Sequence, residues 1–333
     1  MSDGWGPDLL GRAFERRTLP LGEIDGRARE ATLVRHRRPV WQAATGPLRD
    51  IDVLYVHGWS DYFFQTALAD AWAALGARFF ALDLHGYGRS LRPDDIPGYV
   101  TNLDEYDADI AAALAVIGHP VIEPAAPGIH PGHRRLVLMG HSTGGLTLTL
   151  WSARHPGFAS ALVLNSPWLE LQTGALGREM LSPLVQARAR YDPLGQHPVV
   201  DYGYYTRAQR ELGTLPDSPD GWRPERGFPT HPGWLAAIVA GHAKIAAGVE
   251  VGAPALVMLS TATTTPTRWV PTMTASDSVL AVDDIARQAL RIGREVTVGR
   301  IPGGIHDLFL SAPAPRAAAI DLMQRWSRGA LTR

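Results

Sequence analysis

The sequence predicts an α/β fold in which a mostly parallel central sheet is flanked by helices and carries one inserted, mainly helical cap. Two observations support this fold class. Short apolar runs alternate with longer amphipathic segments along most of the chain, which is the pattern of strands joined by helices. The alternation breaks down between residues 167 and 232, where prolines, glycines and aromatic residues are concentrated. We therefore expect a first part of the core at 1–166, a cap at 167–232 and a second part of the core at 233–333.

The core elements follow from this alternation, taken in chain order. The first is a predicted β-hairpin that turns at Asp25-Gly26, with residues 31–35 in the returning strand. Apolar runs then predict strands at 51–56, 78–84, 136–139 and 161–165, and amphipathic segments predict helices at 66–75, 103–117 and 142–155. After the cap, the predicted elements are a helix at 234–247, a strand at 255–259, a helix at 282–291, a strand at 296–301 and a helix at 317–326.

The composition excludes several classes of protein. Of the 333 residues, 45% are hydrophobic and 20% are charged, as in a soluble globular protein. The formal net charge of -1 argues against nucleic acid as a partner, because phosphate binding requires a concentrated positive field. There is no cysteine, which excludes disulfides, thiolate metal sites and a cysteine nucleophile. The N-terminus lacks a secretory signal pattern and no run approaches the roughly 18 apolar residues of a membrane span, so we expect a cytoplasmic protein without an integral membrane segment.

No cofactor or metal is predicted. His130 and His133 have a spacing that metal ligands use, but they lie in a loop rich in proline and glycine without a further ligand nearby. No phosphate-binding glycine fingerprint follows the first predicted strands, which argues against a nucleotide cofactor. We therefore expect the chemistry to depend on side chains of the chain itself.

The segment Gly140-His141-Ser142-Thr143-Gly144 fits the G-x-S-x-G pattern of a nucleophile elbow. It follows an apolar strand and opens a helix, which is the structural context that the pattern requires. The glycines are needed because the strand and the helix approach each other too closely at this turn for larger side chains. The turn also places Ser142 at the N-terminus of a helix, where free N–H groups and the helix dipole favour a developing oxyanion. The sequence therefore predicts Ser142 as a catalytic nucleophile.

Two backbone N–H groups, those of Trp59 and Thr143, form the predicted oxyanion hole. Trp59 follows His57-Gly58 at the end of an early strand, and Thr143 directly follows the nucleophile. We interpret the side chains of the neighbouring histidines as structural. His57 is expected to brace its loop by hydrogen bonding, and His141 is expected to pack beside the elbow.

The predicted general base is His306. The chain has 12 histidines, so position rather than presence distinguishes this one. It lies in the segment Gly303-Gly304-Ile305-His306-Asp307, directly after the last predicted core strand. The flanking glycines allow this loop to carry the imidazole across to Ser142.

The third member of the triad orients the imidazole and stabilises it once it is protonated. We expect it after the predicted strand that ends at Leu259, where Asp277, Asp283 and Asp284 are the candidates. Asp283 and Asp284 stand at the start of a helix, where acidic residues are explained by the helix dipole.

We predict Asp277 as the acid. It begins a loop in which Val279 and Leu280 can anchor the backbone against the core, and an acid that orients the imidazole must project from such a loop. Asp307 ranks last, because it is adjacent to His306 in the sequence and would have to fold back on itself.

These motifs together resemble one branch of the α/β-hydrolase superfamily, the monoacylglycerol lipase, lysophospholipase and serine aminopeptidase-like branch. The resemblance is carried by His57-Gly58, by the segment from Asp83 to Ser90, by the elbow and by Gly304-Ile305-His306-Asp307, and it extends from about Leu21 onward. It implies the α/β-hydrolase fold and a structural role for the Asp83 to Ser90 loop. The branch usually places its acid within a few residues of the strand, whereas here residues 260–276 intervene.

The sequence thus predicts a serine hydrolase that cleaves a carboxylic ester of a small or lipid-like acyl substrate through an acyl-enzyme. Amide or peptide hydrolysis is the first alternative, and it would need a carboxylate in the pocket to bind a peptide amine, for which Glu170 is a candidate. A non-catalytic ligand-binding member of the fold is a second alternative. The order of Ser142, Asp277 and His306 argues against it, because binding alone would not require all three.

Overall fold

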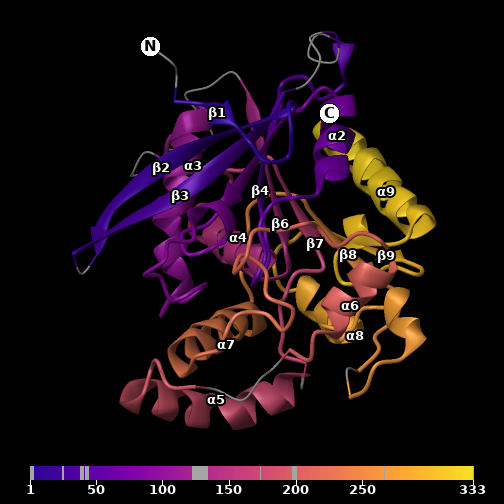
Figure 1. Cartoon of the computed structure of the whole chain (residues 1–333). Helices are drawn as coiled ribbons and strands as arrows, with labels where there is room; N and C mark the ends of the chain where they lie inside the picture. The colour runs from indigo at the N-terminus through magenta and orange to yellow at the C-terminus, as the bar shows by residue number, and fades with distance from the viewer. Residues whose placement is uncertain are drawn as a thin grey trace.

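The computed structural model describes residues 4–24, 26–37, 41, 45–121, 134–172, 174–196, 201–265 and 267–332. These residues form one nine-stranded sheet in the order β1-β2-β3-β5-β4-β6-β7-β8-β9 (Figure 1). Its strands are β1 (Gly6–Pro7), β2 (Phe14–Ile24), β3 (Arg27–His36), β4 (Ile51–Val56), β5 (Arg78–Asp83), β6 (Arg135–His141), β7 (Ala161–Asn165), β8 (Ala255–Ser260) and β9 (Val296–Ile301). The strand order places β4 and β6 near the middle of the sheet.

The sheet is parallel from β5 to β9 and antiparallel at its N-terminal edge. β2 and β3 form the predicted hairpin and β3 pairs antiparallel with β5, whereas β5, β4, β6, β7, β8 and β9 pair parallel to their neighbours. Of the predicted turn, Asp25 lies outside the described residues, and Gly26 has a positive φ of 73°. β4, β7 and β8 are buried along their whole length, which explains their continuous apolar sequences.

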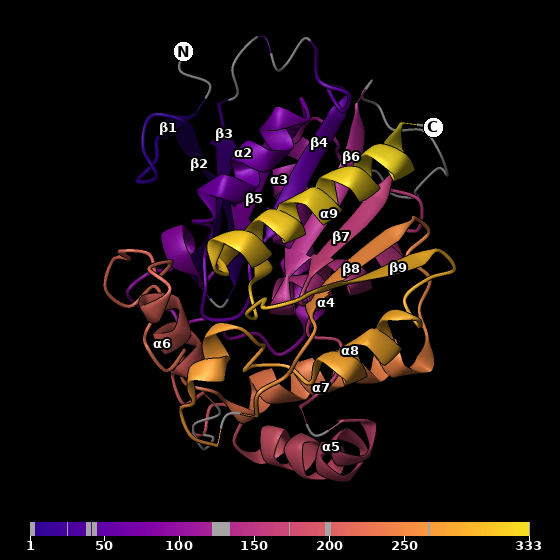
Figure 2. The ribbon, with the colours of Figure 1, turned by 90° about the vertical axis from the view of Figure 1, so that its right-hand side faces the viewer.

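Helices cover both faces of the sheet (Figure 2). They are α2 (Thr66–Ala74), α3 (Asp107–Ile117), α4 (Ser142–Arg154), α5 (Gly174–Tyr191), α6 (Tyr204–Glu211), α7 (Pro232–Ala247), α8 (Val282–Ala289) and α9 (Pro313–Leu331). α2 and α9 pack against one face, and α3, α4 and α8 pack against the other. None of the helices in the described part of the chain is both long and apolar enough to cross a membrane.

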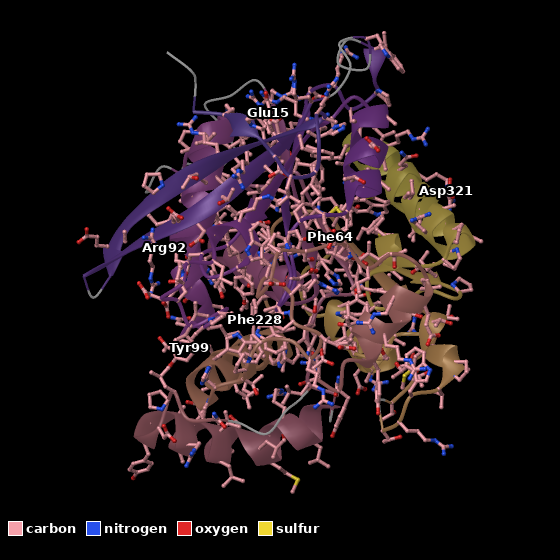
Figure 3. The ribbon with its side chains drawn as sticks, in the orientation of Figure 1. Glu15, Phe64, Arg92, Tyr99, Phe228 and Asp321 are labelled. Atoms are coloured by element: carbon pink, nitrogen blue, oxygen red, sulfur yellow. The ribbon has the colours of Figure 1, made fainter. Side chains whose placement is uncertain are left out.

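Alternate residues of each strand contribute to the two apolar layers, because successive side chains in a strand point to opposite faces. In β4, Val53 and Tyr55 pack with α2 and α9, whereas Leu54 and Val56 pack with α3 and α4. Figure 3 shows how side chains fill the space between these layers, with Asp321 on the outer side of α9. Core side chains therefore cover both faces of the sheet, so functional groups can be exposed only at the ends of the strands.

Two helices differ most from their predicted bounds. The helix expected at 103–117 begins as a 3₁₀ turn, η2 (Leu103–Tyr106), and becomes α-helical only from Asp107. Asn102 and Glu105 form a capping box at its start, which fixes where the chain enters the helix. The last helix, expected at 317–326, extends from Pro313 to Leu331. Its early prolines are compatible with a first helical turn, which explains the earlier start.

The segment 167–232 contributes α5 and α6, and its described residues form no strand. α5 packs along α7, and both lie at the end of the sheet to which the parallel strands point (Figures 1 and 2). α7 begins at Pro232, the last residue of the predicted cap. That this segment acts as a separate cap with these bounds stays a prediction.

A buried histidine links α7 to the residues that follow β7. His242 is fully buried, its Nε2 hydrogen-bonds to the carbonyl oxygen of Trp168 at 2.9 Å, and its ring contacts the Trp168 indole edge-on. Its Nδ1 has no hydrogen-bond partner among the described residues. Burial lowers the pKa of His242 to about 3, because the charged imidazolium would lose its hydration there.

His242 should make the fold less stable in mild acid. Its pKa is about 3 when folded and near 6.5 when unfolded, so the unfolded chain binds a proton that the folded chain excludes. The stabilisation is therefore complete above pH 6.5 and is lost as the pH falls toward 3. We expect a loss on the order of 2 kcal/mol between pH 7 and pH 5, measured by urea unfolding. His242→Gln, which keeps a donor for Trp168 but does not titrate, should lose correspondingly less; equal losses in both proteins would contradict this assignment.

Candidate active site

Ser142 lies at the sharp turn between β6 and α4. Its φ is 51°, in the left-handed region that non-glycine residues rarely adopt. The flanking glycines are required sterically: a Cβ on Gly140 would lie 2.7 Å from the backbone of Gly144 and Gly145, and one on Gly144 would lie 2.2 Å from the carbonyl oxygen of His57. The turn therefore has the geometry of a nucleophile elbow, with the serine held above the strand end.

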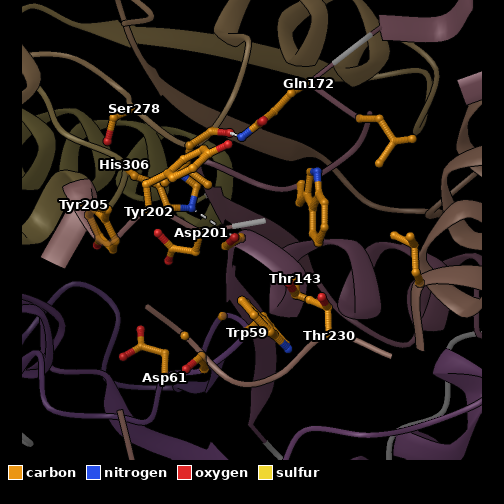
Figure 4. Close-up of a pocket in the computed structure, with 18 of the residues that line it drawn as sticks. Trp59, Asp61, Thr143, Gln172, Asp201, Tyr202, Tyr205, Thr230, Ser278 and His306 are labelled. Carbon is orange, nitrogen blue, oxygen red and sulfur yellow. Dashed lines mark hydrogen bonds between the residues drawn. The ribbon is translucent and has the colours of Figure 1, made fainter. Parts of the chain in front are cut away.

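Two hydrogen bonds join Ser142, His306 and Asp277 in a chain. Nε2 of His306 lies 3.0 Å from Oγ of Ser142, and its Nδ1 lies 3.0 Å from Oδ2 of Asp277. All three side chains are buried. Since a carboxylate only accepts hydrogen bonds, the proton of the neutral imidazole belongs on Nδ1, which leaves Nε2 free to accept the serine proton. Figure 4 shows the His306 imidazole at the wall of a pocket.

The long segment 260–276 returns the chain to the end of β8, which explains why the acid is so far along the sequence. Asp277 forms an isolated parallel bridge with Thr263, and its backbone N–H donates to the carbonyl oxygen of Ala262. Oδ1 of Asp277 then accepts hydrogen bonds from the backbone N–H groups of Val279 and Leu280, at 2.7 and 2.8 Å. One carboxylate oxygen is thus fixed by the loop, and the other faces His306.

The other candidate acids lie elsewhere. Asp283 pairs with Arg300 at 2.7 Å, and Asp284 pairs with Arg287 on its own helix. None of the hydrogen bonds found among the described residues joins either of them to His306. The structure therefore brings only Asp277 of the three aspartates to the imidazole.

Asp307 has a structural position that the sequence did not suggest. Its carboxylate is fully buried and accepts hydrogen bonds from Gln65 Nε2 at 2.9 Å and from Asn165 Nδ2 at 2.7 Å. It also accepts from the backbone N–H of Phe309. These bonds tie the loop that carries His306 to the end of β7 and to the residue before α2. In the sequence, only the position of Asp307 next to His306 could have indicated a role for this residue. The structure shows that the role is to support the loop and not to contact the imidazole.

Both neighbouring histidines are braced by backbone groups, in agreement with the structural roles expected for them. Nδ1 of His57 hydrogen-bonds to the carbonyl oxygen of Gly58, and its Nε2 accepts from the backbone N–H of Leu84. Nδ1 of His141 hydrogen-bonds to the carbonyl oxygen of Asn165 at 3.1 Å. Burial lowers the pKa of His57 and of His141, so both are held in the neutral form.

The backbone around the predicted oxyanion hole is strained and close to the nucleophile. A Cβ on Gly58 would lie 3.0 Å from Cβ of Ser142, so the loop that contains Trp59 reaches the serine directly. Within the described residues, the N–H groups of Trp59 and Thr143 have no hydrogen-bond acceptor. Ser60 and Ser166 share the positive φ of Ser142, at 53° and 44°. Unusual backbone conformations therefore follow three neighbouring strands, β4, β6 and β7.

A cavity of about 280 Å³ opens beside Ser142 and His306. Much of its wall is apolar and comes from α5, α7 and the loop after β7: Trp168, Leu171, Leu181, Val185, Trp234, Leu235 and Val239. Polar side chains line it as well, and Figure 4 shows Asp61, Asp201 and Tyr205 on the same side as His306. The Tyr205 ring stands edge-on to His306, with centroids 5.4 Å apart. The cavity thus combines an apolar wall with a polar region next to the imidazole.

Glu170 is not among the described residues that line this cavity. Its Oε1 accepts from Nε of Arg178 at 3.0 Å, and its Oε2 accepts from Nε2 of Gln288 at 3.0 Å. Both Glu170 and Arg178 are buried. The structure therefore corrects the sequence-based idea that Glu170 binds a substrate amine: this carboxylate instead ties α5 to α8.

The described residues contain no group of three or more histidine, aspartate or glutamate side chains that could hold a metal ion. His130 and His133, whose spacing was considered for a metal, lie outside the described residues. The groups that the structure brings together at the cavity are those of acyl transfer, namely a serine hydroxyl, an imidazole and a carboxylate.

A family model described as serine aminopeptidase, S33, matches residues 49–217, which is about half of the chain. The chain belongs to this family. The match begins just before β4, and it includes both the elbow and the Asp83 to Ser90 loop. It confirms the branch of the α/β hydrolases that the sequence motifs resemble.

Two named relatives match parts of the chain. A monoacylglycerol lipase of Mycolicibacterium smegmatis is 31% identical over 152 residues, which cover 45% of this chain and 47% of that protein. Lysophospholipase L2 of Escherichia coli is 35% identical over 95 residues, which cover 28% of this chain and 25% of that protein. The chain thus matches about half or less of the length of these relatives.

Solved structures confirm the α/β-hydrolase fold. A soluble variant of monoglyceride lipase from Saccharomyces cerevisiae aligns with 92% of this chain and 94% of its own, with a TM-score of 0.63 at 15% identity. A monoacylglycerol lipase of Paleococcus ferrophilus aligns with 86% of this chain and 96% of its own, with a TM-score of 0.61 at 17% identity. At such identities the likeness shows the fold alone.

Proposed function

We propose that this family member is a serine hydrolase that cleaves carboxylic esters with a small or lipid-like acyl group. The observation that carries the proposal is the hydrogen-bonded chain from Ser142 through His306 to Asp277, which opens on a partly apolar cavity. Relatives named monoacylglycerol lipase and lysophospholipase support ester cleavage as the activity. The predicted cytoplasmic location stays a prediction.

The proposed reaction has two halves. Oγ of Ser142 attacks the ester carbonyl carbon while Nε2 of His306 takes the hydroxyl proton, and the carbonyl oxygen becomes an oxyanion held by the N–H groups of Trp59 and Thr143. His306 then gives its proton to the alcohol oxygen as the carbon–oxygen bond breaks, which leaves an acyl group on Ser142. In the second half, water attacks this acyl group by the same route and releases the acid.

Asp277 contributes to both halves without giving up a proton. Its Oδ2 accepts the Nδ1 hydrogen, which keeps Nε2 directed at Ser142. When His306 is protonated, the nearby carboxylate stabilises the imidazolium. The edge of Tyr205 and the ring of His141, whose centroids lie 5.4 and 4.9 Å from that of His306, limit the orientations open to the imidazole.

Amide hydrolysis is the second candidate, and one observation favours it. Two carboxyl groups line the cavity, those of Asp61 and Asp201, and a carboxylate is what a peptide amine would need. However, Asp61 is paired with Arg223 at 3.0 Å. The apolar wall of the cavity matches an acyl chain better than a peptide, so ester hydrolysis remains the proposal.

The proposal is tested with p-nitrophenyl esters of increasing acyl length and a matched p-nitroanilide. We expect kcat/KM to rise from acetate to hexanoate by up to about fourfold per methylene, because each buried methylene contributes about 0.8 kcal/mol. The anilide should be cleaved more slowly than the ester of the same acyl group. Faster cleavage of the anilide, or of an aminoacyl amide, would instead support the second candidate.

A further inference from the structure

Asp201 is a carboxyl group from the segment 167–232 that faces the cavity near the reacting groups. It lines the cavity together with Ser142 and His306, and Figure 4 shows its side chain beside that of His306. Its Oδ1 accepts a hydrogen bond of 2.7 Å from the backbone N–H of Gly203, the residue that precedes α6. This bond fixes the carboxyl group in place at the start of the helix.

The charges around the cavity do not balance. Its described lining includes two carboxyl groups, one guanidinium group, two imidazoles and three phenols: Asp61, Asp201, Arg223, His141, His306, Tyr202, Tyr204 and Tyr205. Nε of Arg223 donates to Oδ1 of Asp61 at 3.0 Å, and both side chains are only 6% exposed, so these two charges cancel. The buried His141 is neutral, and Asp277 offsets the charge that His306 acquires during the reaction. Ionised Asp201 therefore leaves the cavity with one excess negative charge.

This excess charge lies on the alcohol side of a bound ester. In the proposed reaction His306 delivers its proton to the leaving alcohol, so the alcohol must lie next to the imidazole. Burial raises the pKa of Asp201, while the hydrogen bond from the Gly203 N–H, the Arg223 guanidinium and His306 favour its ionised form. A second negative charge on the alcohol would thus be repelled by a partly buried carboxylate that the Gly203 N–H holds in place.

We infer that Asp201 is a specificity-determining residue that excludes esters with an anionic group on the alcohol, and so selects esters of uncharged alcohols. The inference rests on the proposed function and deepens it, because it concerns the alcohol half of the substrate. Asp201 accomplishes this without touching the reacting atoms. Its removal should change the choice between substrates more than the rate of the chemical step.

The test compares two substrates that differ only in one phosphate, 1-octanoylglycerol and 1-octanoylglycerol 3-phosphate, below the concentration at which either forms micelles. For the wild-type protein we expect kcat/KM to be at least about tenfold higher for the neutral ester. Asp201→Asn keeps an oxygen for the Gly203 N–H but removes the charge. It should narrow this ratio by about tenfold, mainly by lowering KM for the phosphate ester.

Two further variants separate charge from folding. Asp201→Ser also removes the charge and should reduce the ratio of the two kcat/KM values as Asp201→Asn does. It serves as the second variant in case asparagine at this position disturbs α6. Asp220→Asn removes a carboxylate from an exposed position of the same segment and should leave the ratio unchanged. A merely structural role of Asp201 would lower both activities together and leave their ratio intact.

Two outcomes would overturn the inference: equal use of the two glycerol esters by the wild-type protein, or an unchanged ratio in both Asp201 variants. Hydrolysis of p-nitrophenyl butyrate is measured on every protein, because this ester carries no glycerol group. If that activity persists, only the inference about Asp201 fails. If the wild-type protein hydrolyses none of the esters, the proposed function fails and the inference fails with it.

Discussion

Ser142→Ala is expected to stay folded and to lose nearly all turnover, on the order of 10⁶-fold as for the removal of a triad serine elsewhere. The reason is that no other hydroxyl in the described cavity lies within hydrogen-bond distance of the His306 imidazole. The loss is measured as kcat for p-nitrophenyl butyrate. In parallel, a fluorophosphonate probe reports on the nucleophile, since it reacts covalently with an activated serine.

The probe should label the wild-type protein and fail to label Ser142→Ala. Ser60→Ala provides a matched control, because Ser60 lines the same cavity and shares a positive φ, but its hydroxyl has no hydrogen-bond partner among the described residues. Labelling should therefore persist in that variant. Persistent labelling of Ser142→Ala would show that another residue is the nucleophile.

Asp277→Asn is expected to lose about 10⁴-fold in kcat while remaining folded. An asparagine amide turned toward Nδ1 would donate to it and place the imidazole proton on Nε2, where it blocks transfer from Ser142. Asp283→Asn and Asp284→Asn should stay close to wild type, since their partners are Arg300 and Arg287.

The comparison is made at equal folded fraction, with thermal unfolding as the check on each variant. Because the three variants are compared with one another, the comparison of kcat identifies the acid even if the wild-type activity is low. If Asp283→Asn or Asp284→Asn is the impaired variant and Asp277→Asn is not, the acid has been assigned wrongly.

The sequence was sufficient where local sterics or complete burial determine the structure. Strands 51–56, 161–165 and 296–301 have the predicted bounds. The first two are continuous apolar runs because helices cover both of their faces. Ser142 could be located because the elbow requires glycines at fixed positions, and His306 because its loop follows the last strand.

The polar side of the cavity could not be predicted, because it depends on tertiary contacts that leave no local pattern. Asp201 and Arg223 lie in a segment without strand–helix alternation, and nothing in the neighbouring sequence indicates that either side chain lines the cavity. Glu170 illustrates the same limit. It was a candidate because a peptide amine would need a carboxylate in the pocket, but the guanidinium of Arg178 in α5 holds it within the interior. The position of Asp277 beside His306 depends on its bridge to Thr263, a tertiary contact that leaves no local sequence pattern. From the sequence, Asp277 could therefore be distinguished only by the expected anchoring of its loop.

The three non-glycine residues with positive φ in the described part of the chain are Ser60, Ser142 and Ser166, and each follows the carboxyl end of a neighbouring parallel strand. A residue held in this region costs about 1 kcal/mol or more, and the surrounding fold must over-determine it to keep it there. Glycine would adopt the same backbone freely. Selection for stability alone would therefore favour glycine at position 142 and remove the hydroxyl that the proposed function requires. Under that function, the strained serine at the end of β6 is a cost in stability that the chemistry imposes on the fold.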